Sequence, residues 1–234
     1  MRWVATSLTA GLLAPLLAAC ATPHPLPEAA GTPAEPAARQ HVLVVSHGPM
    51  ASGQVGSGVA LDANRIVTNR HVVAPRGAVL PVRVTLPDGQ ERRVISVATS
   101  DRMDLAVLAL DGAPLSAPCW RSTGPALGEP QWLLGSPASG RAVLNGRVVE
   151  TAVPDGKFGT LYAVTAAAVP GYSGGAAVDR AGCVAGITTA ASGAGATARA
   201  WALSSNEVLH EVSRIAGFAS LPDGAASERA EVAR

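Results

Sequence analysis

The sequence predicts an all-β fold made of two six-stranded antiparallel barrels followed by a short C-terminal helix. Short apolar runs recur along the chain between turn signals, 25 Gly and 18 Pro supply frequent turns, and no long helical periodicity precedes residue 205. We expect twelve strands, which suits two barrels of six, over residues 42–45, 59–61, 66–68, 79–86, 93–97, 105–110, 131–134, 143–149, 161–165, 176–178, 184–188 and 199–203.

The composition bounds the class of protein. Of the 234 residues, 48% are apolar, 15% are charged and only 3% are aromatic. These values are typical of a compact domain with a core of Val, Leu, Ile and Ala, and they argue against disorder or a coiled coil. The formal net charge is +1 and the chain has no basic run, so we expect no nucleic acid partner.

The first nineteen residues have the pattern of a secretion signal. Arg2 provides a positive start, residues 4–17 are mostly apolar, and small residues precede Cys20. This segment resembles a bacterial lipobox, which implies cleavage before Cys20 and acylation of that cysteine as a membrane anchor. Ala21, where an Asp would signal inner-membrane retention, favours the outer membrane, facing the periplasm or the surface. An ordinary signal peptide and a transmembrane helix are the alternatives, although the apolar run is short for a span.

Four segments follow from this pattern: a lipoprotein signal peptide at 1–19, an acylated Cys and Pro/Ala-rich tether at 20–40, a folded domain at 41–219 and a disordered tail at 220–234. The tether has five prolines and no periodicity, which favours an extended, solvated spacer. We expect His24, His41 and His47, which lie in the tether or at its edge, to be solvated and without a role. Residues 205–216 have the apolar spacing of a helix.

The cysteines fit an oxidising compartment. Besides Cys20 the chain has an even pair, Cys119 and Cys183. A bridge between them would close a loop of about 65 residues. The loop-closure entropy model predicts that such a bridge stabilises the fold by roughly 4 kcal/mol. Two separate buried thiols are the alternative. The chain has no Cys-x-x-Cys motif and no His/Cys cluster, so we expect no metal and no cofactor.

Three short motifs carry candidate chemistry. The run Gly171-Tyr172-Ser173-Gly174-Gly175 predicts a serine hydroxyl exposed on a tight turn whose backbone N–H groups can face an oxyanion. His71 lies in the apolar run 65–73, and Asp104 opens another apolar run. Each motif alone is also explained by a plain turn or a structural histidine. Their order of His, Asp and Ser, with spacings of 33 and 69 residues, is that of the chymotrypsin-type triad.

With these motifs the sequence resembles the protease domain of HtrA/Deg-type trypsin-like peptidases, which have the chymotrypsin fold. The resemblance implies a serine endopeptidase acting on polypeptides, in which Ser173 attacks the scissile carbonyl, His71 transfers the proton and Asp104 orients His71. It also implies an oxyanion hole made by the N–H groups of Gly171 and Ser173. The matching segments lie in family order over roughly residues 41–210, at 56–61, 67–73, 104–110, 127–137, 145–149, 170–175, 186–189 and 202–205.

The resemblance also implies a primary substrate pocket. By similarity its walls are formed by Ala167, Thr188, Thr189, Ala200 and Trp201. None of these residues is acidic, so a preference for Arg or Lys is not expected. We expect a small apolar pocket and cleavage after small aliphatic residues such as Ala or Val.

Two features depart from the family pattern. Digestive relatives have an aspartate before the nucleophile that pairs with a freed amino terminus, and HtrA-like members usually have asparagine, whereas this chain has Tyr172. An acylated, tethered terminus has no way to insert, so we expect no activation by N-terminal processing. The residues after the predicted helix are too few for the PDZ domain that relatives carry, so we expect none.

Two other functions compete with this hypothesis. The serine motif also fits the Gly-x-Ser-x-Gly elbow of α/β-hydrolases, but that fold requires an acid and a histidine after the serine, and the only later histidine is His210 in the predicted helix. The non-enzymatic alternative is an inactive protease-fold lipoprotein that acts as an envelope scaffold or binds peptides. Tyr172 motivates this alternative, while the presence of all three triad residues favours activity.

Overall fold

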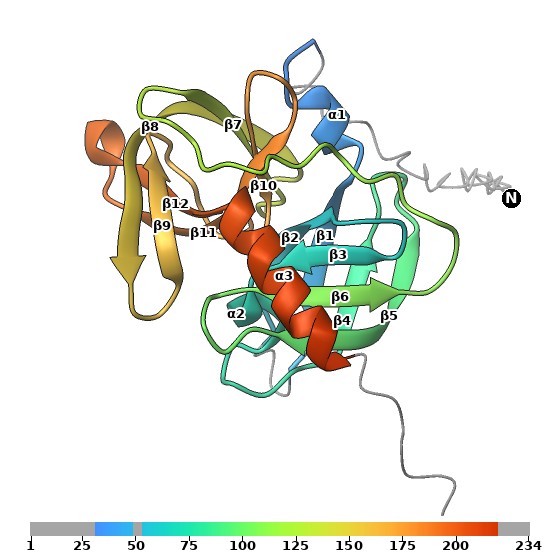
Figure 1. Ribbon diagram of the computed structural model, residues 1–234. Helices are drawn as coiled ribbons and strands as arrows, with labels where there is room; N and C mark the ends of the chain where they lie inside the picture. The colour runs from blue at the N-terminus through green and yellow to red at the C-terminus, as the bar shows by residue number, and fades with distance from the viewer. Residues whose placement is uncertain (1–30, 49–52, 220–234) are drawn as a thin grey trace, which may run out of the picture.

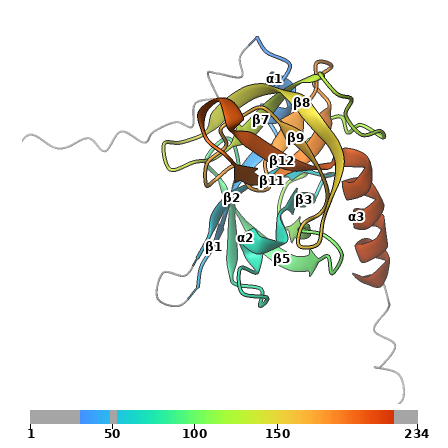
Figure 2. The ribbon, with the colours of Figure 1, turned by 90° about the vertical axis from the view of Figure 1, so that its left-hand side faces the viewer.

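Two closed barrels of six antiparallel strands make up the protein, which confirms the predicted fold class (Figures 1 and 2). The computed structural model describes residues 31–48 and 53–219. The expected signal peptide, the lipidation site Cys20, His24, the first half of the expected tether and the tail after residue 219 lie outside the described residues.

The first barrel pairs its strands in the order β1-β2-β3-β6-β5-β4 and closes between β4 and β1. The apolar side chains that point inward form a core of their own, which includes Val42, Val44, Ile66, Val84 and Leu108. The strands of this barrel are β1 (His41–Ser46), β2 (Val55–Ala60), β3 (Arg65–Thr68), β4 (Val82–Thr85), β5 (Glu91–Thr99) and β6 (Ala106–Leu110).

The second barrel has the order β10-β11-β12-β9-β8-β7 and closes between β10 and β7. β8 is twice as long as predicted: it continues to Asp155, and its pairing with β9 has two irregularities along the way. The strands are β7 (Pro130–Gly135), β8 (Ala142–Asp155), β9 (Gly159–Val164), β10 (Ala176–Val178), β11 (Val184–Ser192) and β12 (Arg199–Ser204), with a 3-10 helix at Gly195–Thr197.

A separate apolar cluster, here called the interbarrel cluster, joins the two barrels. Each fully buried Val, Leu or Ile contributes about 1.5–3 kcal/mol relative to exposure, so this cluster is a major source of the attraction between the barrels. Its members include Val59, Val67, Leu105 and Val107 from the first barrel and Leu134, Leu161, Val178, Val184, Ile187 and Leu203 from the second.

The C-terminal helix α3 (Ser205–Ala219) extends three residues beyond the predicted end. It packs on the interbarrel cluster through Val208, Val212 and Ile215, and Figure 1 shows it lying across the barrels. The buried carboxylate of Glu211 accepts a hydrogen bond from Ser100 in the loop before β6. The helix therefore fixes the loop that leads to Asp104. None of the described helices is long and apolar enough to cross a membrane.

The predicted start of the folded domain at His41 is wrong. Residues 35–38 form a short helix, α1 (Glu35–Ala38), and Ala34, Ala37 and Ala38 belong to the interbarrel cluster, with Ala34 and Ala37 fully buried. Pro33 and Pro36 lie against the turn at Gly182. Alanine and proline are compatible with a solvated tether, but these side chains are small enough to pack closely against the second barrel.

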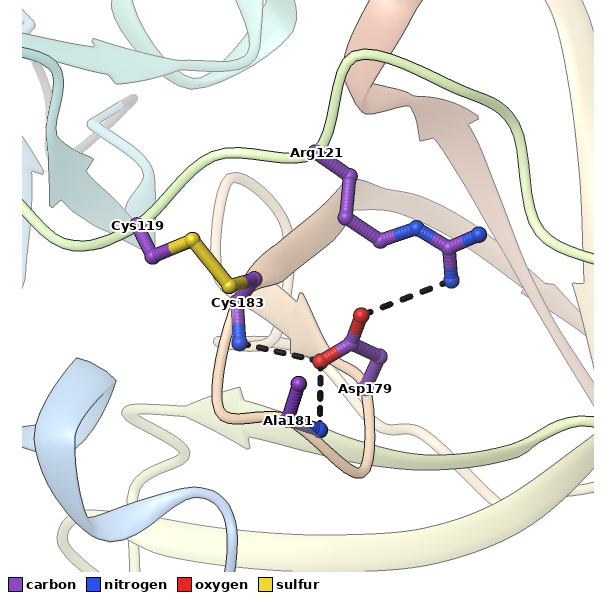
Figure 3. The surroundings of a disulfide bond; sticks show 5 residues. All are labelled: Cys119, Arg121, Asp179, Ala181 and Cys183. Atoms are coloured by element: carbon purple, nitrogen blue, oxygen red, sulfur yellow. Dashed lines mark hydrogen bonds and ion pairs between the residues drawn. A yellow bond between two sulfur atoms is a disulfide. The ribbon is translucent and has the colours of Figure 1, made fainter.

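A disulfide joins Cys119 to Cys183, across a sequence separation of 64 residues (Figure 3). Cys119 lies in the connection between the barrels, and Cys183 lies in the turn between β10 and β11. The carboxylate of Asp179 accepts hydrogen bonds from the N–H groups of Ala181 and Cys183 and pairs with Arg121. The bridge and this ion pair together attach the interbarrel connection to the second barrel.

His41 is fully buried, so the expectation that it is solvated is wrong. Val42 and Val44 point into the first barrel, which places His41 on the outer face of β1. That face is covered by the second barrel, where Ser136 contacts the imidazole. Burial and, to a lesser extent, the positive charge of Arg141 lower the pKa of His41 to about 3.

This burial predicts a specific loss of stability in acid. An unfolded histidine binds a proton below pH of about 6.5, whereas folded His41 stays neutral until about pH 3, so stability falls as the pH decreases between these values by up to roughly 1.4 kcal/mol per pH unit. The substitution His41→Gln removes the titrating group, because an amide does not bind a proton in this pH range. We expect urea unfolding at pH 7 and pH 4.5 to show a smaller decrease in the free energy of unfolding for His41→Gln than for the wild type.

His210→Gln, at an exposed position of α3, is the matched control for loss of a histidine. Equal decreases in stability for the wild type and His41→Gln would contradict the prediction.

Candidate active site

His71 and Asp104 form a hydrogen-bonded pair on the first barrel. His71 lies in the short helix α2 (Arg70–Val73), which follows β3, and Asp104 lies in the loop before β6. The Nδ1 atom of His71 is 2.6 Å from Oδ2 of Asp104, and the backbone N–H of His71 donates to Oδ1 at 2.9 Å. Asn69 adds a hydrogen bond to the Asp104 carbonyl at 2.9 Å. The imidazole is thus fixed in position and in orientation.

The second barrel supplies a further donor to this carboxylate. The hydroxyl of Thr189, in β11, donates to Oδ2 of Asp104 at 2.6 Å. Burial of Asp104 opposes its ionisation, but hydrogen bonds from His71 and Thr189 outweigh burial and hold the pKa of this carboxyl below its usual value. The role of Thr189 was not predicted, since the resemblance assigned this residue to the substrate pocket.

Ser173 lies on a turn of the second barrel between β9 and β10. Gly171 has φ of +104°, a region that disfavours side chains, and a Cβ there would lie within 3.0 Å of the Ser136 carbonyl. The carbonyl of Ser173 accepts a hydrogen bond from the N–H of Ser57 at 2.7 Å, which ties the turn to the first barrel. The sequence motif therefore forms the tight turn that its glycines predict.

The two N–H groups expected to form an oxyanion hole have no hydrogen-bond partner among the described residues. Within residues 31–48 and 53–219, neither the N–H of Gly171 nor that of Ser173 donates a hydrogen bond. By contrast, the N–H of Tyr172 donates to the Val169 carbonyl at 3.2 Å and that of Gly174 to the Thr188 carbonyl at 2.8 Å. The turn thus leaves free the two donors that an anionic oxygen would need.

His71 and Ser173 line the same cleft, of about 330 Å³. No hydrogen bond joins the two side chains in the part of the chain that the structure describes. Such bonds are often long in ligand-free structures and tighten when substrate binds. The side chain of His71 is 32% exposed, so the imidazole is accessible from the cleft.

The walls of this cleft differ from the predicted pocket. Thr188 lines the cleft, together with Ala190 and Ala191 from the same strand. Ala167, Thr189, Ala200 and Trp201 do not contribute to this wall. Instead Ala167 is exposed beside it, Ala200 is buried in the core of the second barrel, and the Trp201 indole donates to Ser192 at 2.8 Å.

The remaining cleft wall is mainly apolar. Val55 and Val169 are each 51% exposed, an unusual exposure for large apolar side chains, and Ala168 lies beside them. None of the described residues that line the cleft is an Asp, Glu, Lys or Arg. The surface is suited to uncharged, apolar side chains. Among the described residues, no three His, Cys, Asp or Glu side chains gather as a metal site.

Tyr172 packs into the second barrel. Its ring is buried in the core there and lies over Gly135, where a Cβ would fall within 3.0 Å of three ring atoms. The bulk of Tyr172 is therefore accommodated by the absence of a side chain at residue 135. The sequence contained both residues, but nothing in it indicated that they meet.

A His–Asp pair on one barrel, and a serine on a glycine-bounded turn of the other, are the arrangement of chymotrypsin-like proteins. Residues 56–187 match the family described as trypsin-like peptidase domain, and the chain belongs to this family. No curated protein matches the sequence.

Solved structures of HtrA-type and related serine proteases are similar to this protein. The active form of the Rv3671c protease from M. tuberculosis is 25% identical, with a TM-score of 0.68 and coverage of 88% of this chain and 94% of that chain. The HtrA-type protease AlgW with a decapeptide is 25% identical, with a TM-score of 0.70 and coverage of 80% and 67%. The serine endoprotease from Yersinia pestis shares the fold, with 23% identity and a TM-score of 0.68. The match covers 78% of this chain and 65% of that chain.

The contact between Tyr172 and Gly135 predicts energetic coupling. Gly135→Ala forces a methyl group against the ring, and overpacking of this kind costs about 1–3 kcal/mol. In a Tyr172→Ala background the methyl group enters space that the ring has vacated, so its cost is expected to be smaller. A double-mutant cycle by urea unfolding measures this coupling. Additive effects of the two substitutions would contradict the proposed packing.

Proposed function

We propose that the protein is a serine endopeptidase that hydrolyses peptide bonds of envelope or secreted proteins. The observation that carries the proposal is the array in which His71 and Thr189 both bind Asp104, together with the cleft that His71 and Ser173 both line. The N–H groups of Gly171 and Ser173, which have no partner among the described residues, support the same function, and so does membership of the trypsin-like peptidase family.

In the proposed mechanism, His71 accepts the proton of the Ser173 hydroxyl as Oγ attacks the scissile carbonyl. The N–H groups of Gly171 and Ser173 bind the oxyanion of the tetrahedral intermediate. His71 then gives the proton to the leaving amine, and water hydrolyses the acyl-enzyme by the same steps. Asp104 remains ionised, because its pKa is held low, and stabilises the imidazolium that forms.

The cleft supports a preference for small aliphatic residues on the acyl side of the cleaved bond. Thr188, Ala190 and Ala191 form a wall of short side chains, and none of the described residues that line the cleft carries a carboxylate to pair with Arg or Lys. Rejection of charged side chains follows from the cost of burying a charge without a partner. Cleavage after Ala or Val is the expected result.

A lipid anchor at Cys20 is the proposed means of localisation to the bacterial cell envelope. The support is the sequence pattern before Cys20. With α1 packed into the interbarrel cluster, the segment between Cys20 and residue 31 would set the distance from the membrane. About eleven residues reach at most about 40 Å when fully extended.

Activity and side-chain preference are tested together by digestion of casein and mapping of the new N-termini. We expect cuts mainly after Ala and Val with the wild type and none with Ser173→Ala. Asp104→Asn is expected to lower kcat by about 10⁴-fold, because the amide favours the wrong tautomer of His71 and removes the charge that stabilises the imidazolium. A wild type that is folded but neither cuts casein nor reacts with a fluorophosphonate probe would favour the inactive scaffold. Predominant cleavage after Arg or Lys would contradict the proposed preference.

The lipid anchor is tested by growing bacteria that express the chain with an alkyne-labelled fatty acid. The wild type is expected to carry the label and to fractionate with membranes. Cys20→Ala is expected to lose the label and to leave the membrane fraction. Cys119→Ala is the control, because the proposal does not assign a lipid to Cys119. A labelled Cys20→Ala protein, or an unlabelled wild type, would rule out acylation at this site.

A further inference from the structure

The peptide group between Gly171 and Tyr172 is held from both sides. Its carbonyl, which belongs to Gly171, accepts a hydrogen bond from the Ser57 hydroxyl at 2.7 Å and another from the Ser136 N–H at 3.0 Å. Its N–H, which belongs to Tyr172, donates to the Val169 carbonyl at 3.2 Å. Because Gly171 also has a fixed positive φ, these contacts determine where its own N–H points.

The two serines that approach this carbonyl both contact His41. The Nε2 atom of His41 is 2.9 Å from Oγ of Ser136 and 3.4 Å from Oγ of Ser57. His41 and Ser57 are fully buried and Ser136 is 5% exposed. The three residues come from β1, β2 and the segment after β7, so the cluster bridges the two barrels behind the oxyanion turn.

The contacts determine the protons in this cluster. Ser57 has one hydroxyl hydrogen and donates it to the Gly171 carbonyl, so its oxygen is an acceptor toward His41. The Nδ1 atom of His41 is buried without a hydrogen-bond partner in the described structure, and a buried N–H without an acceptor is costlier than a bare lone pair. We therefore assign the hydrogen to Nε2, from which it is donated to Ser136 with Ser57 close by.

We propose that His41 is a positioning residue for the oxyanion hole, acting through Ser57 and Ser136 on the Gly171 carbonyl. The Nε2–H group prevents the Ser57 hydroxyl from turning toward the imidazole, so the hydroxyl keeps donating to Gly171. With its carbonyl held in place, Gly171 then presents its N–H to the cleft. This inference rests on the proposed peptidase function, because only a developing oxyanion uses that N–H.

The position of His41 predicts that its replacement slows the chemical step. An apolar side chain at residue 41 would leave Ser57 and Ser136 without the imidazole contact, and the turn would gain freedom to rotate the Gly171 N–H away. Binding of the substrate does not depend on this N–H, whereas the tetrahedral intermediate does. A loss of positioning therefore lowers kcat and leaves KM unchanged.

The test compares His41→Leu, His41→Gln and Ser57→Ala on one peptide substrate identified from the casein digest. Gln places an amide N–H at the same number of bonds from the backbone as Nε2, so it is the conservative replacement. We expect kcat to fall about tenfold or more for His41→Leu and Ser57→Ala, as part of the 10²–10³-fold loss that follows removal of one oxyanion donor. We expect KM to stay within about twofold and His41→Gln to keep most of the activity.

His210→Leu, at an exposed site, is the control for replacing a histidine by leucine. Thermal unfolding of each variant separates misfolding from mispositioning, and Ser57→Ala carries the test if His41→Leu does not fold. Unchanged kcat in a folded Ser57→Ala variant, or a loss that appears in KM, would overturn the inference while leaving the peptidase function intact. A wild type that neither hydrolyses peptides nor reacts with the fluorophosphonate probe would overturn the proposed function and the inference with it.

Discussion

The interbarrel cluster is the constraint on which the rest of the structure depends, because the residues of the candidate site are divided between the two barrels and meet only where the barrels are held together. His71 and Asp104 belong to the first barrel, and Ser173 belongs to the second. Apolar burial supplies attraction but no direction. The relative placement of the barrels is set by hydrogen bonds that cross the boundary, from Ser57 to the Ser173 carbonyl and from Thr189 to Asp104. These bonds lie at the site itself, so the contacts that align the barrels also align the candidate catalytic groups.

The regular elements and the triad candidates were predictable because their signals are local. Alternation of apolar residues, turn glycines and the order of three motifs are all visible along the chain, and the twelve strands follow them. What could not be predicted depends on the surface that another segment provides. His41 is on the outer face of β1, which would be wet in an isolated barrel and is dry only because the second barrel covers it. Ala34 and Ala37 have the composition of a tether, and only their partner surface distinguishes a packed alanine from a solvated one.

The substrate pocket was the part of the site least accessible to sequence. Thr188 and Thr189 are adjacent in β11, at an irregularity in the pairing of this strand with β12. One of them lines the cleft, while the other binds Asp104. An assignment by similarity that treats neighbouring strand residues as a group cannot separate these two functions. In β12, the alternation of side chains along a strand explains why Ala200 is in the barrel core while Trp201 reaches Ser192.

The oxyanion turn is held by two different means, which together account for the unusual residue before Ser173. On one side the Tyr172 ring fills the second barrel over Gly135, and the buried area anchors the turn from within its own domain. On the other side Ser57 and Ser136 hold the Gly171 carbonyl, with His41 behind them. Digestive relatives order the same turn with an aspartate that pairs with a freed amino terminus. Here the described groups that hold the turn, which are the Tyr172 ring and the two serines, all come from the two barrels, so the domain itself supplies this order.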